Sequence, residues 1–197
     1  MKKAVSTAVI LAAGGSSRMG TPKALLKKNG KTFLKILVSS LRTSGIEDIR
    51  VVLGAGAAGI SEHITAPGIC ILINKSWQDG QLSSFKTALK DIGSSSSSVM
   101  LCLIDSPFTG KDTIMEIIDA YKKSDADIAV PLYKGRGGHP VIFSSSTYKA
   151  LLEAPLEEGA RYVVRSGRFK VLRVEVDDKH VLDDIDSPRE YKESVNE

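Results

Sequence analysis

The sequence predicts an α/β fold in which a largely parallel β-sheet carries helices on both faces. Apolar, β-branched runs of strand length alternate with helix-like stretches along the whole chain. The run VMLCLID at 99–105 is apolar at successive positions, as a strand covered on both faces requires. With 197 residues the chain is long enough for one sizeable core, so we expect a single domain over 1–197.

The predicted strands and helices follow one another in a regular order. The first strand is expected at 6–13, and a glycine- and serine-rich loop leads from it to a helix over 32–45 that ends at Gly45. Further strands are expected at 49–54, 69–74, 99–105, 126–133, 139–144 and 169–176. Further helices are expected at 57–64, 82–93, 111–124 and 187–195, with two short helical segments before the strand at 169–176.

Smaller features refine these elements. Asp112 is placed to cap the helix at 111–124, and Pro188 to begin the last helix. The serine run at 94–98 is expected to be a connecting loop. Cys70 and Cys102 lie inside apolar runs, so we expect both to be buried, reduced thiols.

The charge of the chain suits small anionic partners better than large ones. A net charge of +4, from 27 basic and 23 acidic residues, is too small and too dispersed to predict nucleic-acid binding. It does suit an enzyme that handles a polyanionic small molecule. The sequence shows no signal peptide and no apolar run long enough to span a membrane, so we expect no membrane partner and a cytoplasmic location.

The loop after the first strand has the composition of a phosphate-binding turn. Ligands of parallel sheets bind beyond the carboxyl ends of the strands, which directs attention to 14–23, 74–84 and 105–107. The GGSS run at 14–17 can bring backbone N–H groups close to a phosphate, while Arg18 and Lys23 supply positive charge. A plain surface turn with two solvated cations is the alternative interpretation.

Two common nucleotide motifs do not fit. The loop lacks the G-K-[ST] ending of a Walker A motif and the glycine spacing of a dinucleotide fold. The GAGAAG run at 54–59 has that spacing, but the following strand ends at Asn74 without an acid. We therefore interpret 54–59 as a loop with a permissive backbone.

Asp105 and Asp186 are candidate metal ligands. Asp105 ends the most apolar strand, where an unpaired carboxylate is costly to bury. Mg²⁺ takes one or two protein carboxylates and completes its shell with phosphate oxygens and water. DDIDSP at 183–188 supplies the second carboxylate through Asp186, whereas Asp183 and Asp184 can simply be exposed. Helix capping is the alternative role for Asp105 and Asp186.

These segments resemble a known family. LAAGGSSRMGTPKALL at 11–26 is similar to the signature loop of the MobA-like NTP transferases, nucleotidyltransferases that act on the molybdenum cofactor. The resemblance continues through NKSWQDGQLSSF (74–85), LIDSP (103–107), GRGGHPVIF (135–143), EGARYVV (158–164) and VDDKHVLDDIDSPREY (176–191). The LAAG opening is closest to the cytidylyltransferase branch, because the guanylyltransferase branch typically opens with LAGG.

The resemblance implies a fold, a reaction and roles for individual residues. The fold is a three-layer α/β/α, Rossmann-like, mostly parallel sheet of the nucleotide-diphospho-sugar transferase type. The reaction is Mg²⁺-dependent transfer of a nucleoside monophosphate, CMP from CTP, to the phosphate of a molybdopterin-type acceptor in molybdenum cofactor biosynthesis. Arg18, Lys23 and Asp105 are the implied catalytic residues, and Asp105 and Asp186 the implied Mg²⁺ ligands. The implied partners are this nucleotide, this acceptor and a molybdoenzyme or its maturation factor.

The implied substrate-binding residues fall into two sets. Those that bind the nucleotide are Leu11, Ala12, Ala13, Gly14, Gly15, Ser16, Arg18, Lys23, Gly80, Ser83 and Ser84. Those that bind the acceptor are Arg136, Gly138, His139, Pro140 and Arg161.

The chain departs from the family pattern on the acceptor side. Ser106 stands where the family usually has Gln, and Glu157 and Glu158 stand where an Asp is expected. Two alternatives therefore stay open: a nucleotidyltransferase for a sugar phosphate or another alcohol phosphate, and a non-catalytic carrier of a pterin cofactor. Residue types alone do not choose among CTP, GTP and ATP.

Overall fold

The computed structural model describes residues 5–16, 18–62, 64 and 68–196. Its centre is an eight-stranded sheet in the order β10-β7-β9-β6-β1-β4-β5, with β8 paired to β7. The strands are β1 (Thr7–Ala12), β4 (Asp48–Leu53), β5 (Ile69–Ile73), β6 (Ser98–Leu103), β7 (Ile128–Tyr133), β8 (Arg136–Gly137), β9 (Val141–Ser144) and β10 (Val171–Glu175). A separate hairpin joins β2 (Lys27–Lys28) to β3 (Lys31–Thr32).

The sheet is mixed but mostly parallel, as the sequence predicts. β1 runs parallel to β4 and β6, β4 runs parallel to β5, and β7 runs parallel to β10. β9 lies antiparallel between β6 and β7, and β8 is antiparallel to β7.

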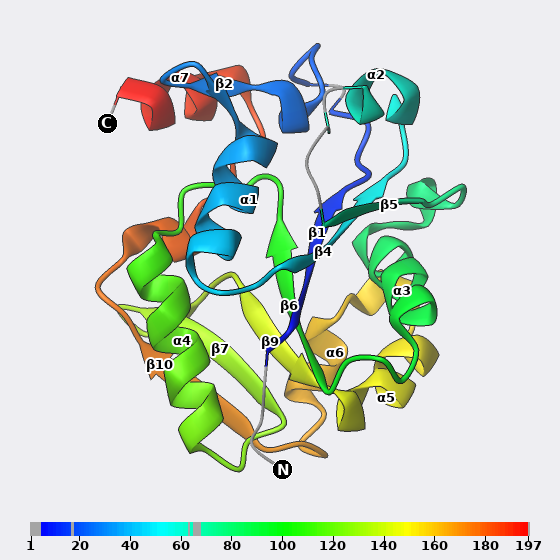
Figure 1. Ribbon diagram of the computed structural model, residues 1–197, viewed down its shortest axis with the longest axis vertical. Helices are drawn as coiled ribbons and strands as arrows, with labels where there is room; N and C mark the ends of the chain where they lie inside the picture. The colour runs from blue at the N-terminus through cyan, green and yellow to red at the C-terminus, as the bar shows by residue number, and fades with distance from the viewer. Residues whose placement is uncertain (1–4, 17, 63, 65–67, 197) are drawn as a thin grey trace.

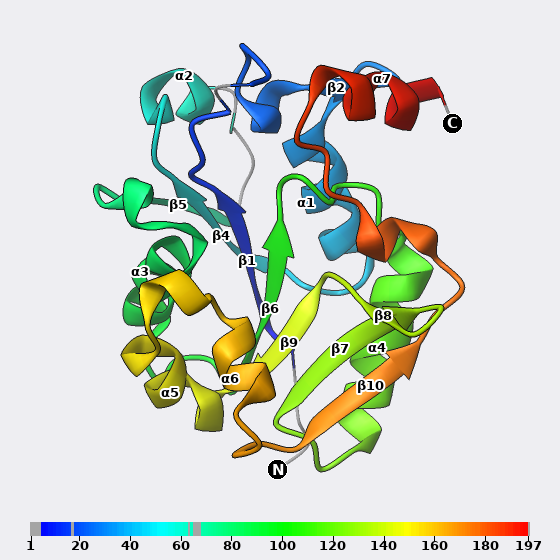
Figure 2. The same cartoon turned by 180° about the vertical axis from the view of Figure 1, so that it is seen from behind.

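Helices cover both faces of this sheet (Figures 1 and 2). The helices are α1 (Phe33–Thr43), α2 (Ala57–Ser61), α3 (Gln81–Ile92), α4 (Lys111–Lys123), α5 (Tyr148–Glu153), α6 (Arg161–Arg165) and α7 (Pro188–Asn196). Short 3₁₀ turns lie at η1 (Lys23–Leu25), η2 (Trp77–Asp79), η3 (Ser145–Thr147), η4 (Leu156–Glu158) and η5 (Lys179–Leu182).

The two faces bury separate apolar cores. α1 and α4 pack on one face, and α3, α5 and α6 on the other. The central strand β1 is fully buried and serves both cores, because Ala8 and Ile10 point to the first while Val9 and Leu11 point to the second. This is the three-layer arrangement expected from the sequence.

The expectations for Asp112 and Cys70 need correction. Asp112 lies in the first turn of α4 and does not cap it; Gly110 holds the cap position. The carboxylate of Asp178 takes over the capping role, because it accepts hydrogen bonds from the Gly110 N–H (3.0 Å) and the Thr113 hydroxyl (2.9 Å). Cys102 is buried as expected, and burial raises the pKa of its thiol to about 12, but Cys70 is only half-buried because β5 is an edge strand.

The serine run is also more ordered than a simple connection. Ser98 begins β6, and both Ser96 and Ser98 are buried. The predicted helix at 57–64 is shorter than expected and ends at Ser61. Helix α7 begins at Pro188, as predicted, and Ser187 and Glu190 hydrogen-bond reciprocally at its start. Within the described part of the chain, no helix has the length and apolar character needed to cross a bilayer.

Candidate active site

A cleft of about 310 Å³ opens beyond the carboxyl ends of β1 and β6. Segments far apart in the sequence meet there, as expected for a parallel sheet. Its lining residues are Leu11, Ala12, Ala13, Gly14, Ser16, Arg18, Pro22, Lys23, Ala24, Ile60, Trp77, Gln78, Gly80, Gln81, Ser84, Ile104, Asp105 and Asp186. Most of the predicted nucleotide-binding and metal-binding residues therefore share one cavity.

The loop after β1 folds back on itself through Ser16. Ser16 has a left-handed backbone with φ of 46°, and its hydroxyl accepts a hydrogen bond from the backbone N–H of Lys23 at 3.1 Å. The turn is tightened by a hydrogen bond from the Met19 N–H to the Ser16 carbonyl at 2.9 Å. Ser17, predicted as part of this loop, lies outside the described residues.

The ring of Trp77 packs against this loop. A Cβ atom at Gly15 would lie 3.3 Å from the indole, and one at Gly54 only 2.5 Å from the Trp77 Cβ. Glycine is therefore needed at Gly54, where the backbone comes this close to Trp77, whereas Gly15, predicted to bind the nucleotide, is not among the residues that line the cleft. Gly54, the first residue of the 54–59 run, thus packs directly against Trp77.

Lys23 lies between two aspartates. Its side chain is only 12% exposed, and Nζ forms ion pairs with Asp105 Oδ2 at 3.4 Å and with Asp186 Oδ1. Arg18, on the more exposed rim, pairs with the other oxygen of Asp186 at 2.7 Å. Both predicted cations therefore point to the predicted metal carboxylates.

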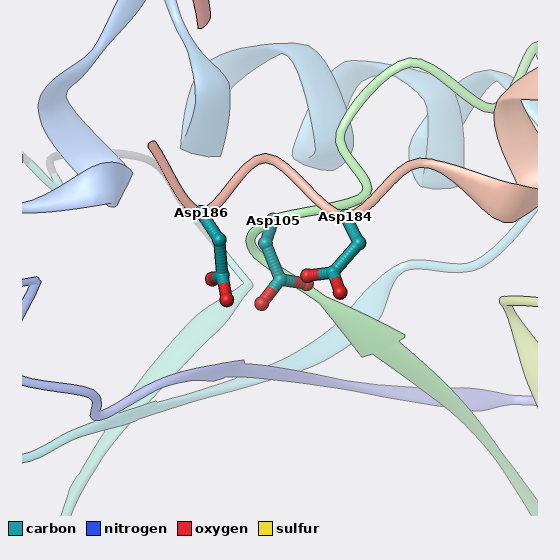
Figure 3. A group of neighbouring side chains, drawn as sticks. All are labelled: Asp105, Asp184 and Asp186. Atoms are coloured by element: carbon teal, nitrogen blue, oxygen red, sulfur yellow. The ribbon is translucent and has the colours of Figure 1, made fainter. Parts of the chain in front are cut away.

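A third carboxylate, Asp184, joins Asp105 and Asp186 (Figure 3). Ligand oxygens of the three lie within 4.8 Å of one another. The Ile185 N–H donates to the Asp105 carbonyl at 3.0 Å, which holds the 184–186 segment against the end of β6. Asp184 is exposed, as expected, but it was not among the predicted ligands, although its spacing from Asp186 places both side chains on one side of an extended segment. Asp183 instead pairs with His180 at 2.9 Å.

The three carboxyl groups differ in their electrostatic environment. Burial raises the pKa of Asp105 despite the nearby Lys23 ammonium. Burial, followed by the charge of Asp105, also raises the pKa of Asp184. The hydrogen bond from Lys23 lowers the pKa of Asp186. This oxygen-only set, with its excess of negative charge, fits a hard divalent cation such as Mg²⁺ or Mn²⁺.

Gly80 and Ser84 line the far wall of the cleft, whereas Ser83 does not. Asn74 Nδ2 donates to the hydroxyls of Ser83 (2.8 Å) and Ser84 (3.0 Å), and the Ser83 hydroxyl also contacts the Gly80 carbonyl at 2.7 Å. These hydrogen bonds of Ser83 stabilise the turn before α3. Trp77, Gln78 and Gln81 also line this wall, and the sequence analysis did not single them out as site residues.

Only some of the predicted acceptor residues lie together. Gly138, His139 and Arg161 line a groove of about 770 Å³ over β7 and β9, whereas Arg136 and Pro140 are not among its lining residues. An intervening groove of about 730 Å³ shares His139 and Arg161 with it, and shares Gln78, Gly80 and Gln81 with the cleft. Burial lowers the pKa of His139 to about 4, so this imidazole is neutral near pH 7.

Comparisons with known proteins place these features in context. A family model described as the MobA-like NTP transferase domain matches residues 8–173. Nicotine blue oxidoreductase of Paenarthrobacter nicotinovorans is 25% identical over 92% of both chains, and purine catabolism protein PucB of Bacillus subtilis is 28% identical over 93% of this chain and 92% of that protein. A probable molybdenum cofactor guanylyltransferase of Geobacillus is 32% identical over 61% of this chain and 60% of that protein.

A solved structure shares the fold along the whole chain. Rv0371c of Mycobacterium tuberculosis superposes with a TM-score of 0.85 at 27% identity, covering 98% of this chain and 100% of that chain. A second structure of Rv0371c, described as a complex with manganese, gives a TM-score of 0.78 at 26% identity, with 97% of each chain covered.

Proposed function

Because the chain belongs to the MobA-like NTP transferase domain family, we propose that this nucleotidyltransferase moves a nucleoside monophosphate from CTP to the phosphate of a molybdopterin-type acceptor. One observation carries the proposal: Arg18 and Lys23 meet Asp105, Asp184 and Asp186 beside an N–H-rich loop. Cations, carboxylates and backbone donors around one cavity are what a metal-bound triphosphate requires.

Asp105, Asp184 and Asp186 would hold the divalent cation, Mg²⁺ in our proposal. Bound there, the ion would act as a Lewis acid on the phosphate oxygens. The complex of Rv0371c with manganese supports a divalent ion in this fold.

The chain's own residues then have distinct tasks. The 11–16 backbone and Gly80 hold the triphosphate and nucleoside, and Lys23 offsets negative charge on the α-phosphate in the transition state. Arg18, on the rim, steadies the leaving pyrophosphate. An acceptor phosphate oxygen attacks the α-phosphorus in line, the α–β bridging bond breaks, and pyrophosphate leaves with that electron pair. No covalent enzyme intermediate is required.

The linked grooves support a large acceptor. Together they run from Gly80 and Gln81 past His139 to Arg161, and each is large enough for a drug-sized molecule. Arg161 is exposed at this wall and would meet an anionic group. The relatives are named for different activities, from nicotine blue oxidoreductase to molybdenum cofactor guanylyltransferase, so the acceptor is tested directly.

A pyrophosphate-release assay tests the reaction. CTP, GTP and ATP would each be offered with a molybdopterin-type acceptor, a sugar phosphate and another alcohol phosphate. We expect the highest rate with CTP and the molybdopterin-type acceptor. A preference for a sugar phosphate would move the function to the first alternative. No heat of binding in calorimetry with any nucleotide plus Mg²⁺ would favour the pterin carrier instead.

Asp105→Asn tests the site. We expect turnover to fall by at least about 100-fold, within the range for lost transition-state electrostatics. Asp125→Asn is the matched control, because Asp125 is an exposed acid that pairs with Lys170. Near-normal turnover of Asp105→Asn would contradict the metal assignment.

A further inference from the structure

We propose that Lys23 makes divalent-metal binding depend on the triphosphate, because its ammonium competes with the metal for the same carboxylate oxygens. This inference rests on the proposed function and assigns Lys23 a second task within it. The metal would bind weakly to the protein alone and tightly once phosphates offer Lys23 another partner.

The ion pairs at Asp186 carry the first step of the argument. Lys23 contacts Oδ1 and Arg18 contacts Oδ2, so both oxygens of this carboxylate already face a cation. Lys23 also reaches Asp105 Oδ2, which leaves Asp184 as the member of the cluster without an ion pair to either cation among the described residues. A metal that binds Asp105 Oδ2 or Asp186 Oδ1 therefore competes with the Lys23 ammonium for that oxygen.

Burial makes this competition strong. The side chain of Lys23 is 12% exposed and that of Asp105 is 20% exposed, so solvent screens their charges only in part. An ammonium and a divalent cation placed together among these carboxylates would repel each other. The metal and the ammonium therefore tend to exclude each other when no further anion is present.

Phosphates bound at the 14–16 loop would offer the Lys23 ammonium a second partner. The backbone N–H of Lys23 is fixed to the Ser16 hydroxyl, so the backbone can stay still while the flexible four-carbon side chain turns. Phosphates held by the 14–16 backbone would lie beside that side chain. Transfer of the ammonium from carboxylates to phosphates then frees the oxygens for the metal. By linkage, the metal must tighten triphosphate binding by the same factor.

The test measures metal affinity directly. Electron paramagnetic resonance of free Mn²⁺ would be recorded with the wild-type protein, Lys23→Met, Lys23→Arg and Lys86→Met, without nucleotide. Lys86→Met is the matched control, because Lys86 is also half-buried but donates to the Ala154 carbonyl, away from the cluster. We expect Lys23→Met to bind Mn²⁺ at least about fivefold more tightly than wild type, the lower end of typical coupling between sites. Lys23→Arg and Lys86→Met should stay close to wild type.

A second arm adds inorganic tripolyphosphate, which carries the phosphates without the base. Wild-type affinity for Mn²⁺ should rise several-fold more than that of Lys23→Met, since only wild type has an ammonium to relocate. Adding Asp105→Asn to Lys23→Met should remove the gain and so locate it at the carboxylates. If Lys23→Met does not fold by circular dichroism, Lys23→Gln serves instead, because it also removes the ammonium from Asp105 and Asp186 and keeps a polar side chain there.

The outcomes separate the two proposals. Folded Lys23→Met with unchanged or weaker Mn²⁺ affinity overturns the competition, even if wild type binds Mn²⁺ together with tripolyphosphate. Absence of Mn²⁺ binding by wild type in both arms overturns the metal site, and with it the proposed function.

Discussion

At the scale of single residues, Asp105 is a carboxyl group whose burial reduces the stability of the folded protein. Its pKa is raised because burial outweighs the attraction of Lys23. A carboxyl group whose pKa is higher in the folded than in the unfolded state reduces stability once the pH exceeds both values. The folded protein therefore carries a charge at Asp105 that the proposed metal and phosphate chemistry requires and that folding does not.

Asp105→Asn should therefore be more stable than wild type at pH 7 while it loses turnover. The neutral amide resembles the protonated acid, so the stability advantage of Asp105→Asn should shrink as the pH falls through the raised pKa of Asp105. It should vanish at a pH where Asp105 is protonated in both the folded and the unfolded wild-type protein. Each kcal/mol gained raises Tm by about 2–4 °C in a chain of this size. Thermal unfolding at several pH values measures the difference in Tm between the variant and wild type. A lower Tm for Asp105→Asn at pH 7 would show that losing the ion pair with Lys23 outweighs the relief from burying a charge.

The sequence predicted most of the residues in the cleft and missed others for identifiable reasons. Arg18 and Lys23 lie in the loop between β1 and η1, and Asp105 follows β6 closely, so the carboxyl ends of these neighbouring parallel strands bring all three together. The spacing of Asp184 from Asp186 was a signal in the sequence, but it pointed to a shared site only if the 183–187 segment was extended and lay against the end of β6. The cap on α4 was missed because Asp178, distant in sequence, supplies it.

At the scale of elements, the segment from β8 to β9 crosses η5 with almost no space between backbones. A Cβ atom at Gly138 would lie 2.0 Å from the Val181 carbonyl oxygen, and the His139 N–H donates to that oxygen at 2.8 Å. This contact fixes His139 at the junction of the two grooves.

Gly138→Ala should therefore destabilise the protein by about 2–4 kcal/mol, the upper range for single substitutions, because rigid backbone must move. Urea unfolding measures the change. Gly59→Ala is the control: it lies in α2 with no atom within 4 Å of the added Cβ, so its stability should be unchanged or slightly higher. Equal stability of the two variants would contradict the close approach at Gly138.

The direction of β9 could not be predicted from its apolar pattern. Strand–helix alternation predicted a mostly parallel sheet, yet β9 runs antiparallel to both neighbours. Apolar runs carry no direction. The short connection from β7 to β9 does contain the signal, since a parallel crossover needs a dozen or more residues.

At the scale of the whole molecule, segments that are distant in the sequence meet in one continuous surface at the carboxyl ends of the parallel strands. The glycine- and serine-rich loop follows β1, Asp105 follows β6, and Asp184 and Asp186 come from the segment before α7. The arrangement was predictable in outline because alternating strands and helices dictate it. The two linked grooves beyond Gln81 were not predictable from the sequence, because their walls depend on how α6 and η4 pack over β7 and β9.

The position of Trp77 has a practical consequence, since it is the only tryptophan in the chain. Its indole lines the cleft and touches the loop at Gly15, so its fluorescence carries a signal from that place alone. We expect tripolyphosphate with Mn²⁺ to shift or quench the indole emission, and Trp77→Phe to abolish the response. Constant emission under conditions where calorimetry detects binding would place the phosphates away from Gly15. The protein thus contains its own optical probe for loading of the site.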